Sequence, residues 1–180
     1  DSFNLLMVER QLRETVQEFY KRGVLDENFV MEATSRTLGG ECSKASKEED
    51  MHKHIDFWWD SPKKGRIGID VKGMKKAKRS DKEFDDTIQW LELKNVLGNK
   101  GWLYGEAEYI AFRTKKKILF VLRDKLREFA EKCVEGKEMV FKCPREFYIP
   151  YQRWGRLDMV IKVPTSDVEA LADFSINCED

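Results

Sequence analysis

Hydrophobic positions recur at helical spacing at the beginning of the chain. Over residues 4–22 they form one stripe, which consists of Leu5, Val8, Leu12, Val16 and Phe19. Residues three and four apart lie on one face of a helix, so the stripe predicts an amphipathic helix that ends at Gly23. Residues 26–38 predict a second, short helix with Asp26 as its N-cap. The polar segment 39–50 has no period, and we expect a loop there.

The centre of the chain changes to a period of two, which is typical of strands with one polar and one apolar face. Residues 52–60 and 66–73 are two such strands, and the turn sequence Ser-Pro-Lys-Lys-Gly joins them at residues 61–65. A connection this short predicts an antiparallel hairpin. The highly charged residues 75–86 then lead to the next strand. Further strands are predicted at residues 87–96, 106–114 and 117–121.

The last third of the chain returns to a helical period and then to strands. The apolar face of the predicted helix consists of Leu122, Leu126, Phe129, Ala130 and Cys133. This helix ends near Gly136, and residues 146–151 and 156–163 predict a hairpin. The order of helix, strands, helix and strands predicts a single α/β domain over residues 1–180, with a central mixed β-sheet flanked by helices.

The composition fits a folded domain rather than a disordered or wholly basic chain. Of the 180 residues, 41% are hydrophobic and 12% are aromatic, which is enough to build a core. Lys and Arg total 33, and Asp and Glu also total 33, so the net charge is zero. Contact with nucleic acid therefore depends on where basic residues cluster, not on the charge of the whole chain.

Cysteine spacing and hydropathy bear on the compartment. The four cysteines form no Cys-x-x-Cys pair and predict neither a zinc site nor a disulfide framework: Cys42, Cys133, Cys143 and Cys178. No apolar run approaches the roughly 20 residues that cross a bilayer, and no signal peptide is visible. We therefore expect a cytoplasmic protein with reduced thiols and no membrane partner.

Polar side chains of the predicted hairpin fall on one face. Alternation places His54 and Asp56 on the polar face of the first strand. It places Asp70 and Lys72 on the corresponding face of the second strand. Because the two strands pair, we expect Asp56 and Asp70 to converge, with Lys72 beside them. The next strand adds Glu92 on its polar face.

Carboxylates and a lysine on neighbouring strands suit the hydrolysis of a phosphodiester. Carboxylate oxygens are hard ligands for Mg²⁺ or Mn²⁺. Such an ion neutralises charge that develops on the phosphate and lowers the pKa of a bound water. A lysine can hold the attacking water or stabilise the transition state. The pattern predicts a metal-dependent nuclease with nucleic acid as its partner and DNA as the favoured substrate.

Here the sequence resembles a family. The run His-Ile-Asp at residues 54–56, followed by Asp-Val-Lys at residues 70–72, resembles the signature of the PD-(D/E)xK nuclease superfamily. That superfamily includes restriction enzymes, Holliday-junction resolvases and phage nucleases. The runs WLELKNV at residues 90–96 and GWLYG at residues 101–105 are similar to its small phage and bacterial members. The resemblance spans about residues 50–115 and implies an αβββαβ restriction-endonuclease-like core.

The resemblance also implies roles for individual residues. By it, Asp56, Asp70 and Val71 hold the metal, and Lys72 is the catalytic lysine. An acidic residue of the first helical region is often a further ligand, and the candidates are Glu9, Glu18 and Glu32. The chain departs from the usual pattern because Ile55 stands where proline is common, and because Asp70 replaces the commoner glutamate. The resemblance places the protein in a bacterial or phage-infected cell, and it admits a homodimer because cutting two strands often needs two sites.

Other patterns leave alternatives open. Asp/Glu-x-Lys also occurs at residues 92–94 and 135–137; the first is a rival motif in a strand and the second is expected to be surface charge. We expect Glu92 to be an auxiliary ligand or a site-orienting residue. His54 either positions a water or phosphate beside Asp56 or has a structural role. Nucleic-acid contacts are predicted at Lys63, Lys64, Arg66, Lys75, Lys76 and Trp102.

Two other classes of function fit the same residues. One is a catalytically inactive nucleic-acid-binding module that keeps the nuclease-like fold. The other is a protein-interaction domain whose charged strands face solvent. Metal binding and cleavage distinguish the enzyme from both.

Overall fold

The first helix is longer than the sequence predicts. The computed structural model describes residues 2–76 and 80–178, with the side chains of residues 17, 18, 21–76 and 80–178. Helix α1 (Ser2–Leu38) is continuous, so the predicted end at Gly23 and the separate second helix are wrong. A glycine inside a helix costs only about 1 kcal/mol relative to alanine, which is too little to end a helix by itself.

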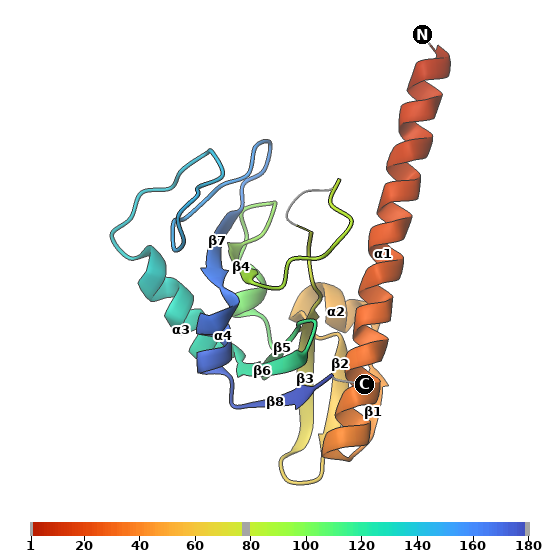
Figure 1. Cartoon of the computed structure of the whole chain (residues 1–180), viewed down its shortest axis with the longest axis vertical. Coiled ribbons are helices and arrows are strands. Elements are labelled where there is room, and N and C mark those ends of the chain that lie inside the picture. The colour runs from red at the N-terminus through yellow and green to blue at the C-terminus, as the bar shows by residue number, and fades with distance from the viewer. Residues whose placement is uncertain (1, 77–79, 179–180) are drawn as a thin grey trace.

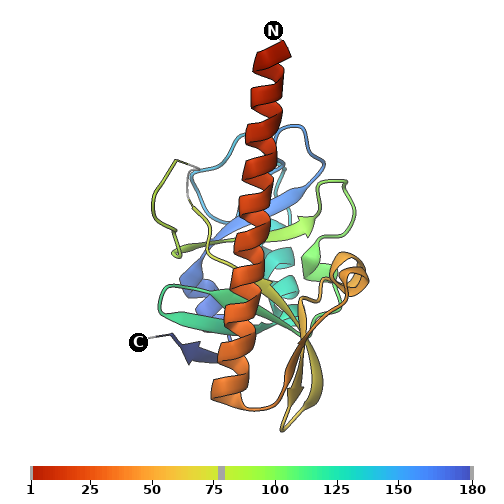
Figure 2. The ribbon, with the colours of Figure 1, turned by 90° about the vertical axis from the view of Figure 1, so that its right-hand side faces the viewer.

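Asp26 is consequently not an N-cap but a residue inside α1. It is buried, and its Oδ1 accepts a hydrogen bond of 2.6 Å from Nη1 of Arg113. The end of α1 that contains Asp26 packs against the large sheet. The N-terminal part of α1 extends past the rest of the molecule, as Figure 1 and the turned view in Figure 2 both show.

Residues 39–50 are not the loop that the sequence predicts. They contain strand β1 (Cys42–Lys44) and most of helix α2 (Lys47–Lys53). Strand β1 is three residues long and α2 buries no residue, so neither leaves a hydrophobic period in the sequence. Helix α2 begins with a capping box, in which Ser46 Oγ accepts a bond from Glu49 N and Glu49 Oε1 accepts one from Ser46 N.

The large sheet is mixed and has the strand order β1-β2-β3-β5-β6-β8. Its further strands are β2 (Phe57–Ser61), β3 (Gly65–Lys72), β5 (Tyr109–Arg113), β6 (Lys117–Leu122) and β8 (Phe174–Asn177). Strands β3 and β5 are parallel, and the other neighbours are antiparallel. The predicted mixed sheet is therefore confirmed.

The predicted hairpin is present as β2 and β3. Its turn is built by Ser61, whose Oγ accepts bonds from the backbone N of Lys63 and Lys64, and by Gly65 at a φ of 77°. Strand β2 begins at Phe57 rather than at residue 52, because α2 occupies the start of the predicted strand.

Two strands form a separate small sheet. They are β4 (Ile88–Lys94) and β7 (Met159–Pro164), paired antiparallel. The predicted strand at residues 87–96 thus exists but does not join the sheet that contains Asp70. Residues 146–151 are not a strand, so the predicted C-terminal hairpin is wrong; Tyr151 makes an isolated bridge to Val160. Pro150 lies inside this segment and lacks the amide donor that a strand ladder needs.

Two hydrophobic clusters cover the two faces of the large sheet. One face packs against α1, and the other packs against the small sheet and three further helices. Those helices are α3 (Arg123–Val134), α4 (Thr165–Leu171) and the 3-10 helix η1 (Trp102–Tyr104). Residues 67–71 of β3 are all buried as a result, although one of them is an aspartate. The described residues form a single α/β domain.

Candidate functional site

A buried carboxylate and a lysine lie at the end of the central strand β3. Asp70 is 2% exposed, and its Oδ1 is 2.9 Å from Nζ of Lys72. The same ammonium lies 4.5 Å from the centroid of the Trp102 ring, so it is held between a carboxylate and an aromatic face. The second oxygen of Asp70, Oδ2, is buried and has no hydrogen-bond partner among the described residues. An unpaired buried oxygen is costly, which indicates a place for a ligand or a proton.

The backbone of β3 fastens Asp56 beside Asp70. Asp56 N donates a bond of 2.8 Å to the carbonyl of Ile69, and Asp56 Oδ2 accepts one of 2.7 Å from Val71 N. These two bonds hold the carboxyl of Asp56 close enough to that of Asp70 for the two groups to interact directly. The structure therefore confirms that Asp56, Asp70 and Lys72 converge.

Two acidic residues that the sequence analysis missed complete the cluster. Glu27 of α1 and Asp50 of α2 each interact with the carboxyl of Asp56. Together with Asp56 and Asp70 they form what we call the carboxyl cluster, which draws on α1, α2 and the β2–β3 hairpin.

The helix residues predicted for this place lie elsewhere. Glu18 is exposed, and Glu32 has a side chain that is 76% exposed and pairs with Arg36. The side chain of Glu9 lies outside the described residues. A signal for Glu27 did exist in the sequence, because it stands three residues before buried Val30 on the inner face of α1. Because the sequence predicts that the first helix ends at Gly23, it did not indicate that Glu27 lies on the same continuous helix.

Burial and mutual repulsion raise the pKa values of the whole carboxyl cluster. Burial, followed by the charges of Asp56 and Asp50, raises the pKa of Glu27 to about 7. Burial, followed by the charge of Asp70, raises the pKa of Asp56 to about 6. The pKa of Asp70 is also raised, chiefly by burial, and the pKa of Asp50 is raised chiefly by desolvation from nearby protein although the residue is exposed overall. Carboxyls that oppose one another in this way favour binding of a proton or a cation.

Two nitrogen-containing side chains, Lys72 and His54, lie near the carboxyl cluster. Burial acts to lower the pKa of Lys72, but the charges of Asp70 and Asp56 outweigh it and raise the pKa. Lys72 is therefore an ammonium at neutral pH. His54 is the C-cap of α2 at a φ of 54°, not the strand residue that the sequence predicts. Burial, followed by the charge of Lys72, lowers the pKa of His54, so its imidazole is neutral near pH 7.

The carboxyl cluster fits a divalent cation in its chemistry. Three of its carboxyls, those of Asp50, Asp56 and Asp70, interact with the ammonium of Lys72, and the buried Asp70 Oδ2 lacks a partner among the described residues. Within residues 2–76 and 80–178, no group of three or more His, Cys, Asp or Glu side chains is already gathered as a metal site. A cation at this place would therefore be held by Asp56 and Asp70, together with backbone oxygen and water. Mg²⁺ suits such a donor set, because this ion usually keeps several of its waters.

The predicted basic residues divide into two groups. Lys63, Lys64 and Arg66 lie at the turn of the hairpin, and Arg66 is separated from Asp70 by about 13 Å of extended strand. Lys64 Nζ is hydrogen-bonded to the Tyr109 hydroxyl at 2.6 Å. Their contact with nucleic acid stays a prediction. Lys75 and Lys76 instead follow β3 directly beyond Lys72.

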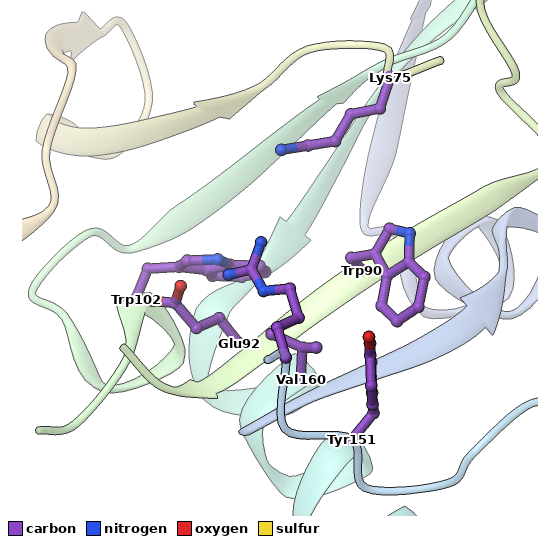
Figure 3. Close-up of a pocket in the computed structure, with 7 residues that line it drawn as sticks. Lys75, Trp90, Glu92, Trp102, Tyr151 and Val160 are labelled. Carbon is purple, nitrogen blue, oxygen red and sulfur yellow. The ribbon is translucent and has the colours of Figure 1, made fainter. Parts of the chain in front are cut away.

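A pocket with a volume of about 280 Å³ opens beside Lys72, and we call it the aromatic pocket. Its walls are Lys75, Trp90, Glu92, Trp102, Tyr151, Arg153 and Val160. Figure 3 shows Trp90 and Tyr151 together on one side, Glu92 and Trp102 on the other, and Lys75 reaching across above them. Trp102 is only 7% exposed and connects the pocket to Lys72.

The rival motif at residues 92–94 is placed differently. Glu92 is half-buried in the wall of the aromatic pocket, where its charge acts on Lys72 and Lys75. Lys94 is exposed at an irregular end of β4. The third motif lies after α3 around Gly136 and is exposed, as the sequence predicts.

Comparison with protein-family models, with curated proteins and with solved structures yields no match for this chain. The residues and their geometry therefore carry the argument for function. Within the part of the chain that the structure describes, none of the helices is both long enough and apolar enough to cross a membrane.

Proposed function

We propose that this chain is a metal-dependent nuclease that hydrolyses phosphodiester bonds, with DNA as its favoured substrate. The observation that carries the proposal is the buried Asp70–Lys72 pair beside Asp56, with Asp70 Oδ2 unpartnered among the described residues. A structural ion pair alone does not explain a lone buried oxygen, nor four carboxyls held close together against their mutual repulsion. In a metal-dependent phosphodiester hydrolase, both features are explained, because carboxylate oxygens bind the divalent cation.

In this proposal Asp56, Asp70 and the backbone of Val71 hold Mg²⁺ or Mn²⁺. When bound, the ion would neutralise phosphate charge and make a bound water more acidic. Lys72 keeps its proton because Asp70 and Asp56 surround it, so its ammonium can orient a water and stabilise negative charge in the transition state. Glu27 and Asp50 position Asp56 by direct interaction with its carboxyl.

The resemblance to the PD-(D/E)xK nucleases supports the same proposal. The two runs that carry the resemblance, at residues 54–56 and 70–72, lie beside each other at the open end of the β2–β3 hairpin. Asp56 directly precedes β2, and Asp70 and Lys72 end β3. The acidic helix residue that the superfamily often adds corresponds to Glu27 in this proposal.

Cleavage of labelled duplexes, junctions and single strands, with Mg²⁺ and with Mn²⁺, tests the proposal. We expect Lys72→Ala to lower the cleavage rate by about 100-fold or more, because it removes a charge that acts on the transition state. Lys94→Ala is the matched control, because it removes the lysine of the rival motif from an exposed position. Circular dichroism and thermal unfolding verify that both variants are folded.

The outcomes separate the functions. If Lys72→Ala cuts at the parent rate, Lys72 has no catalytic role, and a loss confined to Lys94→Ala moves the site to residues 92–94. If the parent binds nucleic acid but cuts none of the forms with either metal, the protein is a binding module.

A further inference from the structure

Two aromatic side chains in the aromatic pocket lie outside the hydrophobic core. Trp90 and Tyr151 are half-buried, and their ring centroids are 6.2 Å apart with the planes tilted by 47°. Within the described residues, neither belongs to the two clusters that cover the large sheet. The backbones of Tyr151 and Val160 of β7 donate a hydrogen bond to each other. Trp90 lies on β4, which pairs with β7. The rings are therefore fixed in place but are not used for core packing.

Cations border the same pocket. Arg153 is held in place by buried Asp158, which accepts bonds from its backbone N at 2.9 Å and from Nε at 2.6 Å. A guanidinium has five donors, so Arg153 keeps others for a ligand. Lys75 lies among like charges: desolvation by nearby protein, followed by Lys72 and Arg153, lowers its pKa although the residue is exposed overall. An anion placed here would relieve that repulsion.

We propose that the aromatic pocket binds the base of an unpaired nucleotide, with its phosphate toward Lys75 and Arg153, so that the substrate is single-stranded nucleic acid. The inference rests on the proposed nuclease function for the step that follows binding. Aromatic rings stack on bases of any sequence, and the cations hold the backbone. Glu92 adds a carboxylate acceptor for the amino group of a base.

Size and pairing both favour an unpaired base. A cavity of about 280 Å³ lies just below the range of ordinary small-molecule sites, so it suits one base and not a double helix. In a duplex, each base is paired and stacked, and extruding it costs a few kcal/mol. A base that is already free enters without that cost. The single strand therefore binds better than the duplex of the same sequence.

Fluorescence anisotropy of the full chain with labelled DNA tests the inference, with EDTA present to prevent metal-dependent cleavage. The probes are a short strand of mixed sequence and its blunt duplex. We expect the parent to bind the single strand at least about tenfold more tightly than the duplex. We expect Tyr151→Ala to weaken single-strand binding by about 5- to 150-fold, the range measured for loss of one stacking ring.

Matched variants separate stacking from other effects. Tyr151→Phe keeps the ring and should bind like the parent, and Trp90→Leu removes the second ring while keeping apolar volume in β4. Lys75→Gln should weaken binding and reduce its salt dependence, whereas Lys132→Gln, at an exposed site on α3, should change neither. Circular dichroism confirms the fold, and Trp90→Leu replaces Tyr151→Ala if the latter does not fold.

Equal or tighter binding of the duplex, or single-strand binding that both ring removals leave unchanged, would overturn the inference. Lys72-dependent cleavage of duplex DNA that Tyr151→Ala does not affect would also overturn it, while leaving the proposed function in place. Ring-dependent binding of the single strand without cleavage in any metal would support the pocket and count against the nuclease.

Discussion

Replacing Glu27 by glutamine removes a half-buried negative charge from the carboxyl cluster and keeps the shape of the side chain. The glutamine amide can still donate a hydrogen bond to the carboxyl of Asp56. The effect of Glu27→Gln on the free energy of unfolding therefore reports the electrostatic environment of the cluster rather than a loss of packing. The structure gives both the sign and the size of that effect.

The pKa of Glu27 rises from an ordinary 4.5 to about 7 in the folded protein. The folded state thus holds the proton to higher pH than the unfolded state, and stability falls as pH rises between these two values. A difference of about 2.5 pH units corresponds to roughly 3.4 kcal/mol, which solvent around a half-buried group reduces to about 1–3 kcal/mol. Glu27→Gln should raise the unfolding free energy by that amount at about pH 8.5, and by almost nothing at about pH 4.

Urea unfolding followed by circular dichroism at the two pH values measures the effect. Glu32→Gln is the control on the same helix, because its side chain is 76% exposed, and it should change stability by less than about 0.5 kcal/mol at either pH. Equal stabilisation by Glu27→Gln at both pH values, or destabilisation of the protein above pH 7, would refute a raised pKa of Glu27.

Two further outcomes follow from the structure. The rate of metal-dependent cleavage should rise between about pH 5 and 7. Burial and the charge of Asp70 raise the pKa of Asp56 to about 6, and the carboxylate form of Asp56 is needed to hold the ion. A rate that is flat over this range would contradict the assignment of Asp56 as a ligand. Gly23→Ala should raise the unfolding free energy by about 0.5–1 kcal/mol, because a Cβ there meets nothing within 4 Å among the described atoms. Urea unfolding measures the change, and a loss of stability would mean that α1 is not continuous at this residue.

The centre of the site could be predicted because its geometry is local. A turn of five residues fixed the β2–β3 hairpin, and the period of two then placed Asp70 and Lys72 on one side. Asp56 followed from the same register. These inferences needed no knowledge of how distant parts of the chain meet.

The remainder depends on contacts between distant segments. The pattern of β4 indicates a strand but does not say that β7, some 70 residues later, is its partner rather than β3. Gly23 is a helix breaker by local propensity, yet packing against the sheet carries α1 through it. Glu27 and the aromatic pocket were missed because both are assembled by such distant packing.

The central claim is that Asp56 and Asp70 hold a divalent cation at the end of β3. Anomalous diffraction from crystals soaked in Mn²⁺ tests it most directly, with Asp70→Asn crystals soaked in the same way for comparison. The account predicts one strong peak in contact with the carboxyls of Asp56 and Asp70, absent from Asp70→Asn. A map from saturated crystals with no peak at these carboxyls, or with a peak that Asp70→Asn leaves unchanged, would contradict it.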